Sequence, residues 1–250
     1  MDQQTIKNAK GVLIAAGLYR PARFVVDHVF HRVRLHERRR RLNFYRQLIA
    51  PGELCFDVGA NIGDYTDTLL SLGARVVAVE PQPSCIEELR ARFVGHDFAT
   101  VVPIALGEAE GTARLFLREH TMLASLIEDW DGRRNLGAVE VPIKTLDQLI
   151  RTYGHPKYIK IDVEGYELPV VRGLHSKVEL ISFEYHPQPK DWAEKLQIIE
   201  LLRKLGDLEL AILCEGAAEW TIGWTKIGDF LKIVPEQIPP LIGDVFCRLL

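Results

Sequence analysis

Features that the sequence lacks exclude several classes of protein. The chain of 250 residues has four cysteines, and none of them forms a CxxC or CxxH pair. This indicates neither a disulfide framework nor a zinc site, and we expect no bound metal and a reducing, cytoplasmic location. The most apolar early stretch, 11–19, is far shorter than the roughly 20 residues that a membrane helix needs, and it has no signal-peptide cleavage site.

The charged residues are numerous but unevenly distributed. The chain carries 31 Lys and Arg against 34 Asp and Glu, a net charge of −3. Residues 1–50 hold 11 basic and 3 acidic side chains, a net of +8, so the other 200 residues carry −11. This asymmetry predicts a basic helical arm, residues 1–48, attached to an acidic domain, residues 49–250.

The arm has an apolar stripe at helical period, formed by Ala22, Val25, Val26, Val29, Phe30 and Val33. Basic residues accompany the stripe and end in the run Arg38–Arg41. The arm could pack on the domain or on a second subunit, forming a homodimer, or it could contact an anionic membrane or a phosphorylated substrate. A nucleic-acid partner is not expected, because no aromatic residues interleave with the charges.

From residue 52 onward, short apolar runs alternate with helical stretches. Helices are expected at 64–72, 84–93 and 192–205, and a hairpin-like insertion at 112–117 and 139–144. Alternating strands and helices predict an α/β fold whose sheet is mostly parallel and covered by helices on both faces. The expected strands of that sheet are Glu53–Val58, Arg75–Glu80, Thr100–Ala105, Tyr158–Asp162, Leu180–Tyr185, Leu208–Cys214 and Asp244–Leu249.

The segment DVGANIG, Asp57 to Gly63, is the most informative motif. A loop that leaves a strand and enters a helix must turn sharply and let a ligand approach the backbone, and Gly59 and Gly63 have no Cβ to prevent this. Asn61, between them, tolerates left-handed backbone angles well. The spacing is not the G-x-G-x-x-G of dinucleotide folds, so the missing glycine argues against the alternative of an NAD(P)-dependent oxidoreductase.

Glu80 supplies a second signal, because it ends the next strand, 23 positions after Asp57. An acidic residue there is placed to bind the two hydroxyls of a ribose. Together the glycine loop and Glu80 predict a ligand that contains a nucleoside but no pyrophosphate, and S-adenosylmethionine fits that description.

Four segments together resemble the FkbM family of S-adenosylmethionine-dependent methyltransferases: Tyr45–Thr66, Val76–Pro81, Lys144–Leu149 and Lys160–Glu167. The resemblance implies a Rossmann-like methyltransferase fold, with a seven-stranded sheet whose last strand is antiparallel. It also implies O-methylation of a hydroxyl on a sugar or small natural-product acceptor. The cofactor-binding positions that it implies are Asp57, Gly59, Asn61, Gly63, Thr66 and Glu80, with Ala105 and Leu106 near the adenine.

Four polar residues are the candidates for catalysis, because ligands of open α/β sheets bind beyond the carboxyl ends of the strands. Asp162 and Glu164 follow one strand, while Glu184 and His186 end the next one, on the same side of it. His186 or Asp162 could take the proton of an acceptor hydroxyl. Structural roles are the alternatives: Glu164 could cap the following helix, and Asp162 or Glu184 could pair with Lys160.

Two further segments could shape an acceptor pocket. The loop 118–137 is as long as many functional lids, and it contains Ser125 and Trp130. Trp220 and Trp224 could stack on sugar rings or pack in the core from one face of a helix. A remaining alternative function is a catalytically silent protein that keeps the cofactor fold and docks to a membrane or partner through the basic arm.

Overall fold

The computed structural model describes residues 36–117, 124–128, 136–237 and 241–250. The chain forms two compact units, residues 1–41 and 42–250. The apolar stripe expected at 22–33 lies outside the described residues, and within them a helix covers 36–45. Residues 42–48, expected in the arm, belong to the second unit, where Phe44 and Tyr45 are buried. No described helix has the length and apolar character to cross a membrane.

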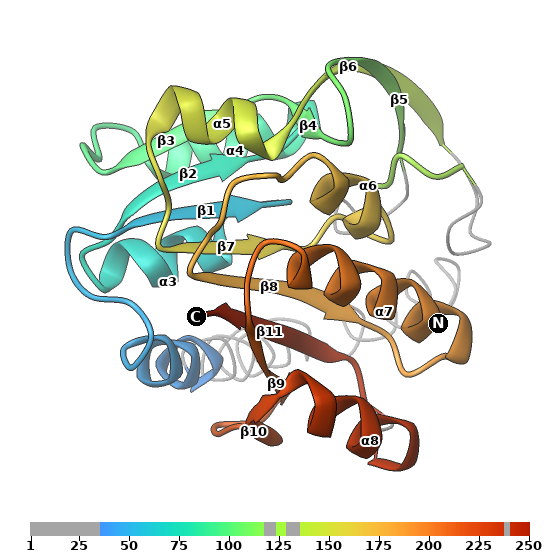
Figure 1. Ribbon diagram of the computed structural model, residues 1–250. Coiled ribbons are helices and arrows are strands. Elements are labelled where there is room, and N and C mark those ends of the chain that lie inside the picture. The colour runs from blue at the N-terminus through green and yellow to red at the C-terminus, as the bar shows by residue number, and fades with distance from the viewer. Residues whose placement is uncertain (1–35, 118–123, 129–135, 238–240) are drawn as a thin grey trace, which may run out of the picture. The chain divides into compact units, whose positions relative to one another are not determined.

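The second unit is built on a mixed sheet with the strand order β10-β9-β11-β8-β7-β1-β2-β3 (Figure 1). β3, β2, β1, β7 and β8 are parallel, while β11 lies antiparallel between β8 and β9. This is the expected seven-stranded arrangement, and β10 adds an eighth strand at one edge. The bounds are β1 Leu54–Val58, β2 Arg75–Val79, β3 Ala99–Val102, β7 Tyr158–Ile161, β8 Leu180–Tyr185, β9 Leu208–Cys214, β10 Ile222–Lys226 and β11 Gly243–Leu249.

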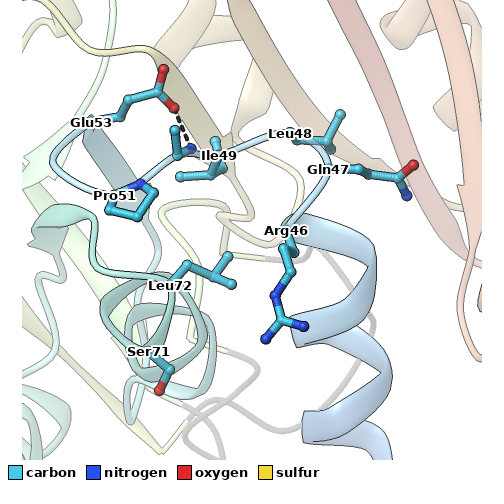
Figure 2. Close-up of a pocket in the computed structure, with 9 residues that line it drawn as sticks. Arg46, Gln47, Leu48, Ile49, Pro51, Glu53, Ser71 and Leu72 are labelled. Carbon is cyan, nitrogen blue, oxygen red and sulfur yellow. Dashed lines mark hydrogen bonds between the residues drawn. The ribbon is translucent and has the colours of Figure 1, made fainter.

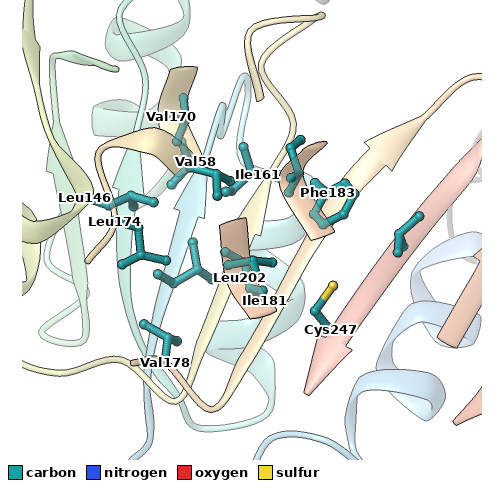
Figure 3. Packing of buried hydrophobic residues seen from close by; sticks show 14 of the residues in the cluster. Val58, Leu146, Ile161, Val170, Leu174, Val178, Ile181, Phe183, Leu202 and Cys247 are labelled. Atoms are coloured by element: carbon teal, nitrogen blue, oxygen red, sulfur yellow. The ribbon is translucent and has the colours of Figure 1, made fainter. Parts of the chain in front are cut away.

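Helices cover both faces of this sheet, as expected. On one face, Phe44, Tyr45 and α3 pack on side chains such as Tyr158 and Phe246. On the other face, α5, α6 and α7 pack on the alternate side chains of the same strands (Figure 3). The helix bounds are α3 Asp64–Ser71, α4 Pro83–Arg92, α5 Leu146–Tyr153, α6 Glu167–Arg172, α7 Pro189–Arg203 and α8 Ile227–Gln237.

A smaller sheet of three strands contains the insertion: β4 Ala105–Leu106, β5 Gly111–Leu117 and β6 Gly137–Lys144, in the order β4-β6-β5. β5 and β6 form the expected antiparallel hairpin. The expected strand Thr100–Ala105 is too long, because β3 ends at Val102 and Ala105 belongs to the small sheet. Pro103 explains the break, since it has no N–H for the ladder.

Trp220 and Trp224 do not lie on one helix face, as the i, i+4 spacing suggested. Trp224 lies in β10, and Trp220 precedes that strand. The Trp220 ring packs edge-on against Phe44 and Phe246, at centroid distances of 4.8 and 5.0 Å. Trp220 therefore contributes to the aromatic core of this face of the sheet.

Candidate active site

The loop between β1 and α3 bends sharply where the glycines were expected to allow it. Gly59, Asn61 and Gly63 have φ angles of 80°, 49° and 88°, all left-handed. A Cβ on Gly59 would lie 1.7 Å from the carbonyl oxygen of Asp162. The loop therefore passes directly against the backbone that follows β7, and only glycine fits at position 59.

Asp57 and Thr66 fasten this loop to the first turns of α3. The Thr66 hydroxyl donates to Asp57 Oδ2 at 2.6 Å, and both side chains are buried. Burial raises the pKa of Asp57, although the nearby Lys160 and the Thr66 hydroxyl lower it. Their hydrogen bond joins the end of β1 to α3 and so holds together the two elements that the loop connects.

Glu80 lies at the end of β2 and contacts the same loop. Its Oε2 accepts the N–H of Asn61 and its Oε1 accepts the N–H of Gln82, both at 2.8 Å. Burial raises the pKa of Glu80 to about 7, against the two N–H bonds that lower it. Each carboxylate oxygen has two lone pairs, so Glu80 can still accept a hydrogen bond at each oxygen.

Ala105 and Leu106 are buried in β4, where they pair with Ile143 and Lys144 of β6. The structure therefore places them in the smaller sheet. The N–H of Glu80 bonds the carbonyl of Val102, the last residue of β3, three positions before Ala105.

Asp162 follows β7 and forms an ion pair with a buried lysine of that strand. Lys160 Nζ lies 2.6 Å from Asp162 Oδ2, although only 1% of Lys160 is exposed. The same Nζ lies 4.2 Å from the centroid of the Tyr65 ring on α3. The expected structural partner of Lys160 is therefore Asp162, and Lys160 fixes one of its two oxygens.

Glu184 and His186 lie on the same side of the β8 end and contact each other. His186 Nε2 lies 3.3 Å from Glu184 Oε2. This contact is the largest cause that raises the pKa of His186, whereas burial raises the pKa of Glu184. A carboxylate that orients an imidazole in this way is a common arrangement for proton transfer.

Glu164 has a strained backbone, with φ at 55°. The hydroxyl of Ser125, from the long loop after β5, donates to the Glu164 carbonyl at 2.8 Å, while Trp130 of that loop lies outside the described residues. Burial and the nearby acids raise the Glu164 pKa to about 9, so this carboxyl is neutral at pH 7. Glu164 does not cap α6, whose N-cap is Tyr166.

Sequence reasoning missed Asp244, which lies in β11 directly opposite Glu184. Burial and the charges of Asp162 and Glu184 raise its pKa to about 7. Asp244 thereby extends the acidic cluster formed by Asp162 and Glu184. Among the described residues, no group of three or more His, Cys, Asp or Glu side chains is arranged to hold a metal ion.

A pocket of about 510 Å³ lies elsewhere, between residues 46–53 and the end of α3 (Figure 2). Arg46, Leu48, Glu53 and Leu72 are among its lining residues. It adjoins the amino end of β1, whereas Gly59, Glu80 and Asp162 lie beyond the carboxyl ends of the strands. The candidate site residues therefore lie at the carboxyl edge of the sheet, away from this pocket.

A mostly parallel sheet, a glycine loop after β1 and an acid at the end of β2 define the class: α/β proteins that bind a nucleoside cofactor. A family model described as the methyltransferase FkbM domain matches residues 57–208. The chain belongs to the FkbM methyltransferase family, and S-adenosylmethionine is its methyl donor. The residues fit that cofactor, because Glu80 keeps free acceptor positions at the end of β2, beside the loop that follows β1.

One relative is the hexuronic acid methyltransferase AglP of Haloferax volcanii, 28% identical over 200 residues, which cover 75% of this chain and 80% of the relative. Among solved structures, a TehB-like SAM-dependent methyltransferase from Corynebacterium glutamicum matches with a TM-score of 0.48 and 9% identity, over 84% of this chain and 88% of that one. Aeropyrum pernix fibrillarin matches with a TM-score of 0.46 and 8% identity, over 80% and 68%. The assignment rests on the family match.

Proposed function

We propose that this methyltransferase transfers the methyl group of S-adenosylmethionine to a hydroxyl of a carbohydrate. The observation that carries the proposal is the acidic cluster of Asp162, Glu184 and Asp244, with His186 in contact with Glu184. A hydroxyl must lose a proton to accept a methyl group, and this cluster offers a base. The name of the relative, which acts on a hexuronic acid, supports a sugar as the acceptor.

On the cofactor side, we propose that Glu80 binds the ribose hydroxyls and that the main chain of the loop from Gly59 to Gly63 contacts the rest of the bound molecule. Asp57 and Thr66 hold that loop in shape through their hydrogen bond. Ala105 and Leu106 are assigned to the adenine, as the family resemblance implies. The bound cofactor supplies an electrophilic methyl group on a sulfonium.

On the acceptor side, we assign His186 as the base and Asp162 as the residue that orients the acceptor. Lys160 engages one oxygen of Asp162, which leaves the other to accept a hydrogen bond from the sugar. Glu184 holds the His186 ring and stabilises its protonated form. The hydroxyl proton passes to His186, and the oxygen takes the methyl group as the bond from that carbon to sulfur breaks. The products would be a methyl ether and S-adenosylhomocysteine.

Methyl transfer is expected to increase with pH and then level off. His186 can accept a proton only when it is neutral, and Glu184 raises its pKa above the usual value of about 6.5. Replacing Glu184 with glutamine removes the largest cause of that rise, so the ascending limb of the kcat/KM profile is expected to shift to lower pH. An unchanged midpoint in Glu184→Gln would contradict the role of His186.

The acceptor is tested with radiolabelled S-adenosylmethionine and matched pairs of hexoses and hexuronic acids, as free sugars and as glycosides. A hexuronic acid offers hydroxyls and a carboxylate, and these give products of different stability: an ether survives mild alkali, whereas an ester is hydrolysed. We expect an alkali-stable product, because an acidic cluster disfavours an anionic acceptor group at the point of transfer. An alkali-labile product would contradict O-methylation of a hydroxyl, and no product with any sugar would contradict the carbohydrate acceptor.

The roles considered for the basic arm, membrane contact and formation of a homodimer, stay predictions. The assignment of a separate arm also stays a prediction, with the difference that residues 42–48 belong to the second unit.

A further inference from the structure

A buried ion pair joins α6 to α7, and neither of its residues has been given a role above. Lys195 of α7 and Glu167, the first residue of α6, approach to 2.8 Å between Nζ and Oε2. Each of the two residues is only 1% exposed. Removing two charges from water is costly, and a hydrophobic pair of the same size is often as stable, so stability alone is a weak explanation for this pair.

The Glu167 end of the pair holds the backbone of the loop after β7. Glu167 Oε1 accepts the N–H groups of Val163 and Gly165, each at 3.2 Å. Between these two residues lies Glu164, whose left-handed backbone is costly for any residue other than glycine. Glu167 thus stabilises the bend that directly follows Asp162.

The Lys195 end leads to His186. Lys195 Nζ lies 3.2 Å from Asp191 Oδ1, and Asp191 Oδ2 accepts the backbone N–H of His186 at 2.7 Å. One continuous chain of contacts therefore joins the loop 163–165 to the end of β8. We call Glu167, Lys195 and Asp191 the charged bridge.

We propose that Lys195 is a positioning residue for methyl transfer, which through the charged bridge fixes the loop that carries Asp162 relative to His186. The inference rests on the proposed function, in which Asp162 orients the acceptor and His186 takes its proton. These two tasks need a fixed separation, because the acceptor must meet both residues at once. Lys195 stabilises both carboxylates of the bridge, so its loss leaves the buried Glu167 and the half-buried Asp191 without their shared cation.

The charges of the bridge also affect the pKa of His186. The described charged groups around His186 are Glu184 on its own strand and Asp191 and Lys195 on α7. Glu184 and Asp191 raise the His186 pKa, whereas Lys195 lowers it. Removing the Lys195 charge therefore moves the pKa of His186 upward.

The test replaces Lys195 with methionine, which keeps the length of the side chain and removes its charge. The control is Arg203→Met, on the same helix, where the ion pair with Glu200 is exposed. For Lys195→Met we expect a loss in kcat of about 100-fold, a typical consequence of a misplacement near 1 Å, with the affinity for S-adenosylhomocysteine within about twofold of wild type. The ascending limb of the pH profile shifts to higher pH, and Arg203→Met changes neither quantity.

A compensating variant separates positioning from loss of folding. Adding Glu167→Gln to Lys195→Met removes the unpaired carboxylate, while the amide oxygen can still accept the N–H groups of Val163 and Gly165. We expect the double variant to recover part of the lost kcat. Should Lys195→Met not fold, Asp191→Asn tests the same bridge, because asparagine can still accept the His186 N–H but no longer pairs with Lys195; a pH profile and kcat equal to wild type would overturn the proposal.

Amide hydrogen exchange keeps this proposal distinct from the proposed function. In Lys195→Met the amides of Val163, Gly165 and His186 are expected to exchange faster than in wild type, and in Arg203→Met at the wild-type rate. If wild type methylates no sugar, the proposed function fails. Hydrogen exchange at these three amides then tests by itself whether the charged bridge holds the loop and the end of β8. Unchanged exchange at all three amides would overturn the inference, as would a kcat loss explained entirely by the unfolded fraction.

Discussion

Replacing Glu80 with alanine is expected to weaken the binding of S-adenosylhomocysteine by at least about 100-fold. Hydrogen bonds to a charged group contribute about 1.5–3 kcal/mol each, and we assign two ribose hydroxyls to this carboxylate. The variant also removes the acceptor for the N–H groups of Asn61 and Gln82, so the loop itself loses support. Isothermal titration measures the loss directly.

The matched control is Glu87→Ala, which removes the same carboxylate from the exposed surface of α4. We expect its affinity to equal that of wild type. Equal affinities in Glu80→Ala and Glu87→Ala would show that Glu80 does not bind the cofactor.

The pH dependence of cofactor binding gives an independent check on Glu80. Because burial raises its pKa to about 7, Glu80 is protonated below that pH in the free protein, and binding of the ribose to the carboxylate must first remove that proton. The affinity of wild type is therefore expected to increase with pH by up to about tenfold per unit below 7, and then to level off. In Glu80→Gln this dependence should disappear.

Replacing Gly59 with alanine is expected to destabilise the fold by more than about 4 kcal/mol, or to prevent folding. The new Cβ would lie 1.7 Å from the Asp162 carbonyl oxygen and 2.8 Å from its carbonyl carbon, and both are backbone atoms that a rotamer change cannot move. The φ of 80° adds the strain of a left-handed residue. Relief of this contact requires the loop after β1 to move away from the backbone that follows β7, and these strands carry Asp57 and Lys160 in register.

Gly216→Ala is the control for the backbone strain alone. Gly216 has a nearly equal φ of 82°, but a Cβ there meets nothing within 4 Å. We expect this variant to lose about 1–2 kcal/mol, measured by urea unfolding. If Gly59→Ala unfolds at the same urea concentration as Gly216→Ala, the result would contradict the close contact between the loop and the Asp162 backbone.

Much of the cofactor side could be predicted from the sequence because its signals are local. The bend at Gly59 and Gly63 and the position of Glu80 depend on short stretches of chain. The structure has the bend in the expected loop, and Glu80 directly follows β2, one residue beyond the end of the strand. Glu184 and His186 share one side of β8 because side chains alternate along a strand. The break of β3 could also have been found, since Pro103 stands inside the apolar run.

The groups that sequence analysis missed depend on contacts between distant segments. Asp244 joins the acidic cluster only because β11 pairs with β8 in a register that sets it opposite Glu184, 60 positions away. Lys195 reaches Glu167 only because α7 packs against α6. A lysine in an amphipathic helix is normally assigned to the solvent face, although Lys195 stands three residues after Trp192 and four before Ile199, on the buried stripe of α7.

A crystal structure with S-adenosylhomocysteine tests the central claim most directly. The expected result is a ligand at the carboxyl ends of β1 and β2, with the ribose hydroxyls within hydrogen-bond distance of the Glu80 carboxylate and the Gly59–Gly63 backbone against the rest of the molecule. A ligand bound elsewhere, such as in the pocket beside Arg46, or a Glu80 side chain turned away from the sugar, would contradict the account.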